Sequence, residues 1–322
     1  EAHRARKALF ISLLMGDGID EAAKVTGEAF DEAAASWRGA GPVTLFDGTA
    51  KVIARGMTRW TGVPVTGPEA DDLAADLVAM VDGFATVGPR HWRALAARRR
   101  RERWLASMIE RVRTKELTAD PDSALARVAF FAEDGGLLDA RTAAVELLNI
   151  IRPATAVAWF AAYAGHALDR RPSNAARLRA GDDGFTTAFV HEVRRFYPFA
   201  PFLGGRATRD LTFRGEPVPK GALVLLDVYG QNHDPALWPN PYEFRPERFL
   251  DRTPGEFDLI PQGGGDPRTG HRCPGEKMTM ALLGTLAQRI ARLDHFLIPQ
   301  DLSIDLSRIP ARVASGVRIV AP

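Results

Sequence analysis

The spacing of apolar residues along the chain predicts a protein built mainly from helices. In five stretches, apolar side chains recur every three or four residues or fill nearly every position, as in helices with a buried face. These stretches are residues 21–37, 71–84, 140–168, 189–197 and 277–293. Residues 206–213 and 222–229 alternate or run apolar between turns that contain Gly and Pro, which predicts two strands. With short strands expected over residues 303–320, the predicted fold class is mainly α with a small β region.

Charge and cysteine content exclude several kinds of site. The 322 residues include 42 Lys and Arg against 40 Asp and Glu, so no excess of positive charge points to a nucleic-acid partner. A single cysteine, Cys273, rules out an internal disulfide and any zinc or iron–sulfur site built from several cysteines. One cysteine without a disulfide framework fits the reducing cytoplasm, where we expect the protein to work.

The most apolar stretch, residues 143–168, carries an arginine in its middle. Glu146, Arg152 and Pro153 interrupt the apolar run, so we do not expect it to span a membrane. The side chain of Arg152 must either reach the surface or hold an anion, because an unpaired buried charge is very costly. Pro153 removes a backbone hydrogen bond and is expected to kink the helix.

Cys273 lies at the end of a glycine-rich loop, residues 261–273, just before the helix predicted over residues 277–293. The free N–H groups and the dipole of a helix N-terminus favour a thiolate, so Cys273 is expected to be a nucleophile or a metal ligand. A phosphate-binding P-loop is excluded because Glu276 stands where a lysine is required. A cysteine phosphatase is excluded because Thr279 stands where that class needs an arginine.

This loop closely resembles the heme-binding loop of the cytochrome P450 fold, in which one cysteine thiolate is the proximal ligand of the iron. The resemblance implies that the cofactor is heme b, that Cys273 binds its iron and that His271 points at a heme propionate. A stretch near the start of the chain is similar to the helix that reaches the propionates in this fold. Its basic residues, candidates for neutralising the propionates, are His3, Arg6 and Lys7.

The resemblance also implies a single heme-thiolate catalytic domain over residues 1–322. Its small sheet is expected to be formed largely by residues 206–229 and 303–320. Because the sequence opens at Glu1 rather than at a methionine, we expect an N-terminal part of the fold to be missing.

Residues 149–156 lack the acid–alcohol pair that most enzymes of this fold carry on the matching helix, since neither Asp nor Glu is present. An Arg-Pro pair at this place, here Arg152 and Pro153, resembles the fatty-acid peroxygenase branch. These are bacterial enzymes that hydroxylate or decarboxylate fatty acids with hydrogen peroxide. The similarity extends from His3 to about Gly316. Long matching stretches occur at residues 87–92 and 192–199.

Peroxide already has the oxidation level that the reaction needs, so the resemblance implies no redox partner. One peroxide oxygen must still lose a proton and the other must gain one. By the resemblance, Arg152 clamps the carboxylate of a long-chain fatty acid, and that carboxylate is the acid–base group. The apolar tail is expected to lie along a groove. Its candidate lining residues are Pro153, Val87, Phe199 and Phe202.

Glu192 and Arg195 lie three residues apart on a predicted helix, as either a surface ion pair or a structural brace. In the resembling fold, this pair joins an arginine of a later Pro-Glu-Arg-Phe segment, here Arg248. Together they support the thiolate loop, and we interpret the three residues as structural.

Two other functions remain open from the sequence. One is a monooxygenase of the same fold that receives electrons from a reductase, and the other is a heme-binding sensor in which Arg152 anchors a regulatory fatty acid. Turnover with peroxide separates both from a peroxygenase. The sequence does not distinguish α-hydroxylation, β-hydroxylation and decarboxylation, because part of that choice sits upstream of Glu1 in the family.

Overall fold

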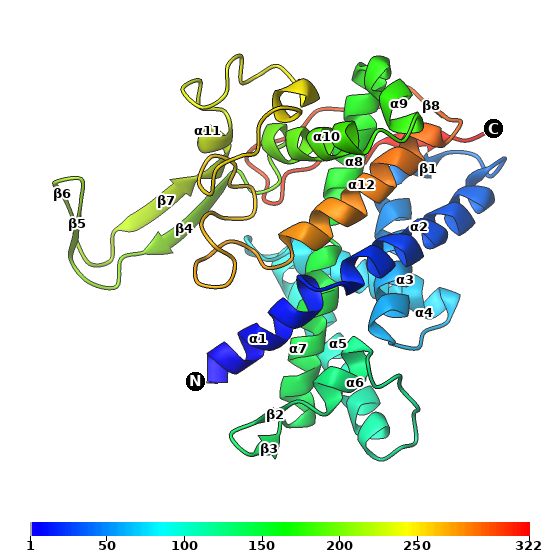
Figure 1. The fold of residues 1–322 in the computed structure, drawn as a ribbon, viewed down its shortest axis with the longest axis vertical. Helices are drawn as coiled ribbons and strands as arrows, with labels where there is room; N and C mark the ends of the chain where they lie inside the picture. The colour runs from blue at the N-terminus through cyan, green and yellow to red at the C-terminus, as the bar shows by residue number, and fades with distance from the viewer. Residues whose placement is uncertain (1) are drawn as a thin grey trace.

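Helices account for most of the structure, a computed structural model that describes residues 2–322, with side chains from Arg6 onward (Figure 1). The α-helices of the described residues are α1 (Ala2–Leu14), α2 (Gly18–Trp37), α3 (Leu45–Thr61), α4 (Gly67–Asp82), α5 (Pro89–Arg113), α6 (Ala124–Ala129), α7 (Ala140–Ala154), α8 (Val157–Arg170), α9 (Pro172–Arg179), α10 (Asp183–Phe196), α11 (Val228–Asn232) and α12 (Glu276–Arg292). A short 3₁₀ helix covers Pro246–Phe249. All five stretches with helical spacing fall on helices, which confirms the mainly helical prediction.

Helix α8 lies in the centre of the core because it is apolar on nearly every side. Trp159, Phe160 and Tyr163 are all buried on it. Helices α3, α9, α10 and α12 pack around α8, and α12 also packs along α2 (Figure 1). The hydrophobic core is continuous from Leu9 on α1 to Ala321 near the C-terminus.

The apolar stretch over residues 140–168 forms two helices rather than one. Pro153 has no N–H to donate, so the regular hydrogen-bond ladder of α7 is interrupted there. The N–H groups of Thr155 and Ala156 instead donate to carbonyls three residues back, at 3.1 Å each, which tightens the turn into the 3₁₀ form. The predicted kink at Pro153 is confirmed, and the expectation of one continuous helix is wrong because the kink divides it.

The strands are short and, in the described residues, form several separate antiparallel sheets. Strand β9 (Arg318–Val320) pairs with β1 (Val43–Thr44) and β8 (Phe296–Leu297). The other pairs are β2 (Ala132–Glu133) with β3 (Gly136–Leu137), β4 (Phe202–Arg206) with β7 (Leu223–Asp227), and β5 (Leu211–Phe213) with β6 (Glu216–Val218). The β4–β7 ribbon projects from the helical body and carries β5 and β6 at its end (Figure 1).

This arrangement corrects the predicted sheet. Residues 206–229 and 303–320 do contribute strands, but they do not share a sheet, because β7 pairs with β4 whereas β9 pairs with β1 and β8. Alternation of apolar residues predicts that a strand forms. The partner of the strand depends on which distant segments the fold brings together.

Among the described residues, only the stretch Ala140–Arg170 is long and apolar enough, by length and composition, to cross a membrane. The stretch comprises α7 and α8, and most of it is buried inside the protein. Packing in the core accounts for its apolar composition.

Candidate active site

A mostly apolar cavity of about 400 Å³ lies beside Cys273, which is a typical volume for a small-molecule site. Its wall is built by the end of α4, the break between α7 and α8, and the loop that leads into α12. Apolar side chains in this wall include Leu14, Met80, Val81, Phe84, Ile150 and Pro153. Of the described residues that line the cavity, none is Asp or Glu, and the guanidinium of Arg152 is the only cationic group.

The loop before α12 places the thiol of Cys273 in this wall. Gly263 has a φ of +86°, and a Cβ there would lie 2.7 Å from the carbonyl oxygen of His271, so the two segments of the loop approach closely only with glycine. The backbone N–H of Cys273 donates to the carbonyl of Gln262 at 2.9 Å. The N–H of Gly275 donates to the sulfur, as expected at the start of a helix.

Burial determines the protonation of Cys273 in the protein alone. Loss of water around the sulfur raises the pKa of the thiol, and the hydrogen bond from Gly275 lowers it by less. The start of α12 favours the thiolate, as expected, but its effect on the pKa of Cys273 is smaller than that of burial. A thiolate at this position needs a cation next to the sulfur, and a heme iron is such a cation.

The residues around the sulfur fit a heme better than a bare metal ion. Among the described residues, no group of three His, Cys, Asp or Glu side chains could hold a metal ion. A metal bound by Cys273 would therefore take its other ligands from a cofactor, as a porphyrin supplies them. The apolar cavity next to the thiol provides a space for that cofactor.

Arg152 lies in the same cavity wall with almost no partner of its own. Among the described residues, its only hydrogen bond runs from Nη2 to Oδ1 of Asn149 at 3.4 Å, a long and weak contact. Burial lowers the pKa of Arg152, and repulsion by Arg98 lowers it further. The predicted alternative of a side chain that reaches the surface does not describe this position, because Arg152 faces the cavity. A guanidinium in an apolar wall without a counter-charge is suited to bind an anion.

Glu192 is fully buried at the centre of the predicted brace. Its carboxylate accepts two hydrogen bonds from Arg195, at 2.7 and 2.8 Å, and one from Nε of Arg248 at 3.3 Å. It also accepts the backbone N–H of Arg245 at 2.7 Å. The structure thus brings the three predicted residues together, and the alternative of a surface pair is wrong.

The direct link from α10 to the thiolate loop is an arginine that was not predicted. Arg194 is buried, donates from Nε to the side-chain oxygen of Gln262 at 3.1 Å and forms an ion pair with Glu276. Arg272 donates to the same carboxylate at 2.8 Å. Burial alone would raise the pKa of Glu276, but Arg194 and Arg272 outweigh it and lower that pKa. Residues 194 and 276 are 82 positions apart, so local spacing carried no signal for this pair.

The residues predicted at the heme propionates reach different places. Arg6 donates to two carboxylates of the protein, on β2 at 2.9 Å and on α7 at 3.2 Å, so its charge is already neutralised and the prediction for Arg6 is corrected. Lys7 donates to a backbone carbonyl of the thiolate loop at 3.3 Å, and His271 lies exposed on that loop. The side chain of His3 lies outside the described residues, so its role stays a prediction.

Of the residues predicted along the apolar groove, Phe199 and Pro153 line the cavity, whereas Val87 and Phe202 do not. Val87 is 88% exposed in the turn between α4 and α5, and Phe202 begins the projecting strand β4. Both predictions are wrong for the cavity wall, because an apolar residue type does not show which way its segment turns. Phe160, which was not predicted, lines the cavity from α8. Its position about two helical turns after Arg152 was the available signal.

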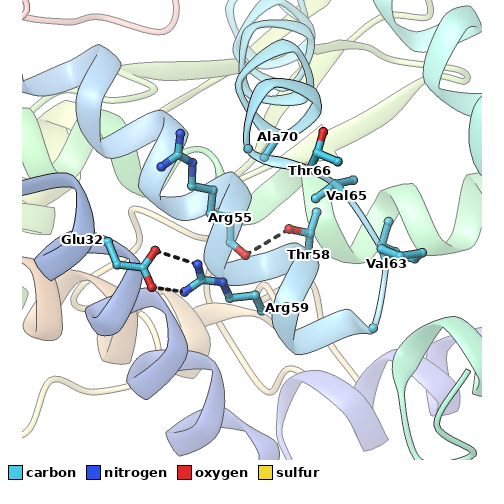
Figure 2. A pocket seen from close by; sticks show the side chains of 11 residues that line it. Glu32, Arg55, Thr58, Arg59, Val63, Val65, Thr66 and Ala70 are labelled. Atoms are coloured by element: carbon cyan, nitrogen blue, oxygen red, sulfur yellow. Dashed lines mark hydrogen bonds and ion pairs between the residues drawn. The ribbon is translucent and has the colours of Figure 1, made fainter. Parts of the chain in front are cut away.

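A second hollow, of about 460 Å³, is lined by Arg55 and Arg59, and Figure 2 shows Arg59 paired with Glu32. Arg59 donates to both carboxylate oxygens of Glu32, at 3.0 and 2.7 Å. These hydrogen bonds raise the pKa of Arg59 and lower that of Glu32. Arg55, in the same hollow, donates to Asp71 at 2.8 Å. Because these charges are matched within the chain, the cavity at Cys273 is the stronger candidate for the active site.

Comparisons of the sequence with known families point to one family. The family described as cytochrome P450 matches residues 184–302. The putative cytochrome P450 137 of Mycobacterium tuberculosis is 33% identical over 152 residues, which are 46% of this chain and 30% of that protein. The human cytochrome P450 4A11 is 31% identical over 141 residues, which are 42% of this chain and 26% of that protein. The chain thus spans less than a third of the length of these relatives.

Two solved structures match nearly the whole chain. Cytochrome P450SP alpha (CYP152B1) in complex with (R)-ibuprophen has a TM-score of 0.91 and 36% identity, over 99% of this chain and 79% of that one. A variant of cytochrome P450 OleT in complex with arachidonic acid has a TM-score of 0.92 and 34% identity, over 99% and 77%. The chain therefore belongs to the cytochrome P450 family of heme b oxidoreductases, in the branch that contains P450SP alpha and OleT.

Proposed function

We propose that the protein is a peroxygenase that uses hydrogen peroxide to oxidise long-chain fatty acids at Cα or Cβ, by hydroxylation or by decarboxylation to a terminal alkene. The observation that carries this proposal is Arg152, which lies in an apolar cavity beside Cys273 and has no carboxylate partner among the residues that the structure describes. The ligands named in the two solved relatives, ibuprofen and arachidonic acid, are both carboxylic acids, which supports an anion site.

Arg152 binds the substrate carboxylate through two parallel N–H groups, because the guanidinium fork matches carboxylate geometry. The long contact with Asn149 is the only hydrogen bond between Arg152 and described residues that has to be released. Apolar walls exclude water and strengthen the ion pair. Phe160 and Phe199, which also line the cavity, provide contacts for the first part of the acyl chain. The fixed head group selects the carbons next to it for oxidation.

When bound through Cys273, the heme supplies the iron that activates peroxide. The N–H of Gly275 and the side chain of Gln262 donate to the sulfur and so stabilise its thiolate form. Cleavage of the O–O bond needs a group that takes a proton from one oxygen and returns it to the other. No described residue of the cavity wall is a carboxylic acid, so the substrate carboxylate held by Arg152 takes this role.

The first test compares Arg152→Ala with the wild-type protein, both loaded with heme. The rate of peroxide-driven oxidation of a long-chain fatty acid should fall, because binding and proton transfer are lost together. The activation free energy should rise by about 3 kcal/mol or more. The heme spectrum should not change. The matched control is Arg312→Ala, a partly buried arginine that does not line this cavity and should retain activity. Retained turnover in Arg152→Ala would contradict the clamp.

The second test asks whether the carboxylate is the acid–base group. A short carboxylic acid should restore peroxide turnover on an apolar substrate that lacks a carboxylate, and this rescue should fail in Arg152→Ala. Equal rescue in both proteins would place the acid elsewhere. Turnover with NADPH and a reductase but none with peroxide would favour a monooxygenase, and no turnover with either would favour a sensor.

A further inference from the structure

An aromatic chain leads from the cavity wall into the core and ends at a histidine. Phe160 lines the cavity, and its ring centroid lies 6.2 Å from that of Tyr163, one turn further along α8. Tyr163 stacks on Tyr197, with 4.6 Å between the centroids and 8° between the ring planes. The hydroxyl of Tyr197 lies 2.7 Å from Nδ1 of His166. Both tyrosines are buried, and His166 is partly buried.

The two stacked tyrosines differ in the group that accepts their hydroxyl hydrogen. Tyr163 donates to the backbone carbonyl of Ala311, which cannot hold a proton at any ordinary pH. The hydroxyl of Tyr197 faces an imidazole nitrogen, which can accept and hold a proton in the tautomer that carries its hydrogen on Nε2. A phenol that loses an electron becomes a strong acid, so its oxidation is favourable only where a base receives the proton. Of the two, Tyr197 alone has such a base.

The protonation states of Tyr197 and His166 suit this transfer. Burial lowers the pKa of His166 to about 4, with a further decrease from Arg170 and Arg171 against an increase from Asp169. Near neutral pH the imidazole is therefore uncharged and its Nδ1 can accept. Burial also raises the pKa of Tyr197 well above the ordinary value of a phenol, so the phenol keeps its proton until it is oxidised.

We infer that Tyr197 and His166 form a redox-active pair that removes oxidising equivalents from the cavity when a carboxylate at Arg152 allows peroxide to react but no oxidisable acyl chain is in reach. One electron leaves Tyr197 through the stacked ring of Tyr163 toward the cavity. The O–H bond of Tyr197 breaks, and its proton moves to Nδ1 of His166. The products are a neutral phenoxyl radical and an imidazolium, so the pair as a whole has lost one electron and no proton.

The oxidant is hydrogen peroxide, the co-substrate in the proposed function. The physiological role of the pair therefore rests on that proposed function. Hydrogen peroxide accepts two electrons and two protons to give two molecules of water. Two electrons, supplied one at a time by Tyr197, therefore reduce one molecule of peroxide. After each passage, a one-electron donor from solution, such as ascorbate or a phenol, reduces the Tyr197 radical. The proton returns from His166 to the phenolate oxygen at that step. Without such a route, the oxidant would attack the side chains that line the cavity, which include Met278 and Phe160.

The test uses the heme-loaded protein without fatty acid, mixed with a peroxy acid and frozen within milliseconds for electron paramagnetic resonance. A peroxy acid does not depend on the Arg152 site, and bleaching or shifting of the heme band reports that the oxidant has reacted. We expect a neutral tyrosyl radical in the wild-type protein. Tyr197→Phe keeps the stacked ring but leaves only Tyr163, whose hydroxyl donates to a backbone carbonyl rather than to a base that could receive its proton. The signal should therefore fall by about tenfold or more, because a positioned proton acceptor typically accounts for roughly 10²–10⁴-fold in rate.

Two further variants separate the proton acceptor from general damage to the protein. His166→Gln keeps a hydrogen-bond acceptor but cannot hold a proton, so the radical should again be lost. The matched control is His295→Gln, which changes a histidine bonded to a backbone carbonyl elsewhere and should leave the signal unchanged. Tyr242→Phe removes an exposed tyrosine and should also leave it unchanged. A radical that persists in Tyr197→Phe, or that vanishes equally in Tyr242→Phe, would overturn the inference.

A second measurement does not need a functional enzyme. In protein labelled with ¹⁵N-histidine, Nδ1 of His166 should show the chemical shift of a hydrogen-bonded acceptor near neutral pH, and this shift should change in Tyr197→Phe. A protonated imidazole, or a chemical shift of Nδ1 that is the same in Tyr197→Phe, would overturn the assignment of His166. A reacted heme band without a tyrosyl signal would overturn the redox pair and leave the proposed function untouched.

Discussion

Arg195 is fully buried and Arg152 is partly buried, but of the two only Arg195 has a carboxylate partner among the described residues. Arg195 makes two hydrogen bonds to the buried Glu192 and further ones to backbone carbonyls at 2.9 Å. Arg152 makes one long hydrogen bond to a neutral amide among the described residues. A buried charge without a partner is costly, so the fold satisfies the first arginine and leaves the second unsatisfied.

The difference separates a residue that holds the fold from one that waits for a ligand. The network around Glu192 ties α10 to the irregular segment after α11, and Arg194 continues it to the thiolate loop. Within the part of the chain that the structure describes, no such network reaches Arg152, whose neighbours in the cavity wall are mainly apolar. We therefore expect substitutions in the two regions to act on different quantities, namely the free energy of unfolding in the first and ligand affinity in the second.

The largest expected effect is that of Glu192→Ala. Removal of this carboxylate leaves Arg195 and Arg248 buried without a counter-charge, which should lower the free energy of unfolding by about 3–5 kcal/mol. Urea unfolding of the heme-loaded protein measures the change, and loss of heme should accompany it. The control is Glu247→Ala, an exposed glutamate of the 3₁₀ helix. A Glu192→Ala protein as stable as this control would show that the network is not needed.

Arg152→Met should show the opposite pattern. Because the protein contributes little to neutralising Arg152, its replacement by an apolar side chain of similar length should leave the free energy of unfolding within about 1 kcal/mol or increase it. The free energy of fatty-acid binding should become less favourable by about 2–5 kcal/mol, since a charged partner is lost in an apolar cavity. Thermal unfolding and calorimetric titration with a fatty acid measure the two quantities. A destabilisation like that of Glu192→Ala would remove the distinction between the regions.

Acid titration sharpens the comparison at Glu276. Arg194 and Arg272 keep the pKa of Glu276 below its ordinary value of 4.5 in the folded protein, despite the effect of burial. A depressed pKa adds stability that is present above the unfolded value and is lost as pH falls through the folded one. Wild-type protein should therefore be more stable than Glu276→Gln near neutral pH, with the gap closing below about pH 4.5. Urea midpoints across this range measure it, and a gap independent of pH would contradict the ion pair.

The smallest effect is expected in the second hollow. Arg59 and Glu32 form a well-aligned ion pair, but their side chains are 42% and 54% exposed. Water and salt screen such a pair, so Arg59→Ala should change the free energy of unfolding by only about 0–1 kcal/mol. The same urea unfolding measures it. A loss as large as that of Glu192→Ala would show that burial does not decide the rank of these ion pairs.

The sequence by itself determined the features that depend on neighbouring positions. Helical spacing predicted the main helices, and Pro153 predicted the kink because the missing N–H is a property of that residue alone. The glycine-rich loop before Cys273 predicted a close turn, which Gly263 makes with its positive φ. Glu192 and Arg195 are three residues apart on one helix, so their contact followed from helix geometry.

Only the tertiary structure decided the features that depend on which distant segments meet. It directed Arg6 to two carboxylates of the protein, placed Val87 outside the cavity wall and stacked Tyr163 on Tyr197. It also set the balance at the Cys273 thiol, where loss of water around the sulfur raises the pKa by more than the helix N-terminus lowers it. The folded arrangement determines which side chains lose water and which residues far apart in the sequence come into contact. Residue type and spacing do not predict either of these.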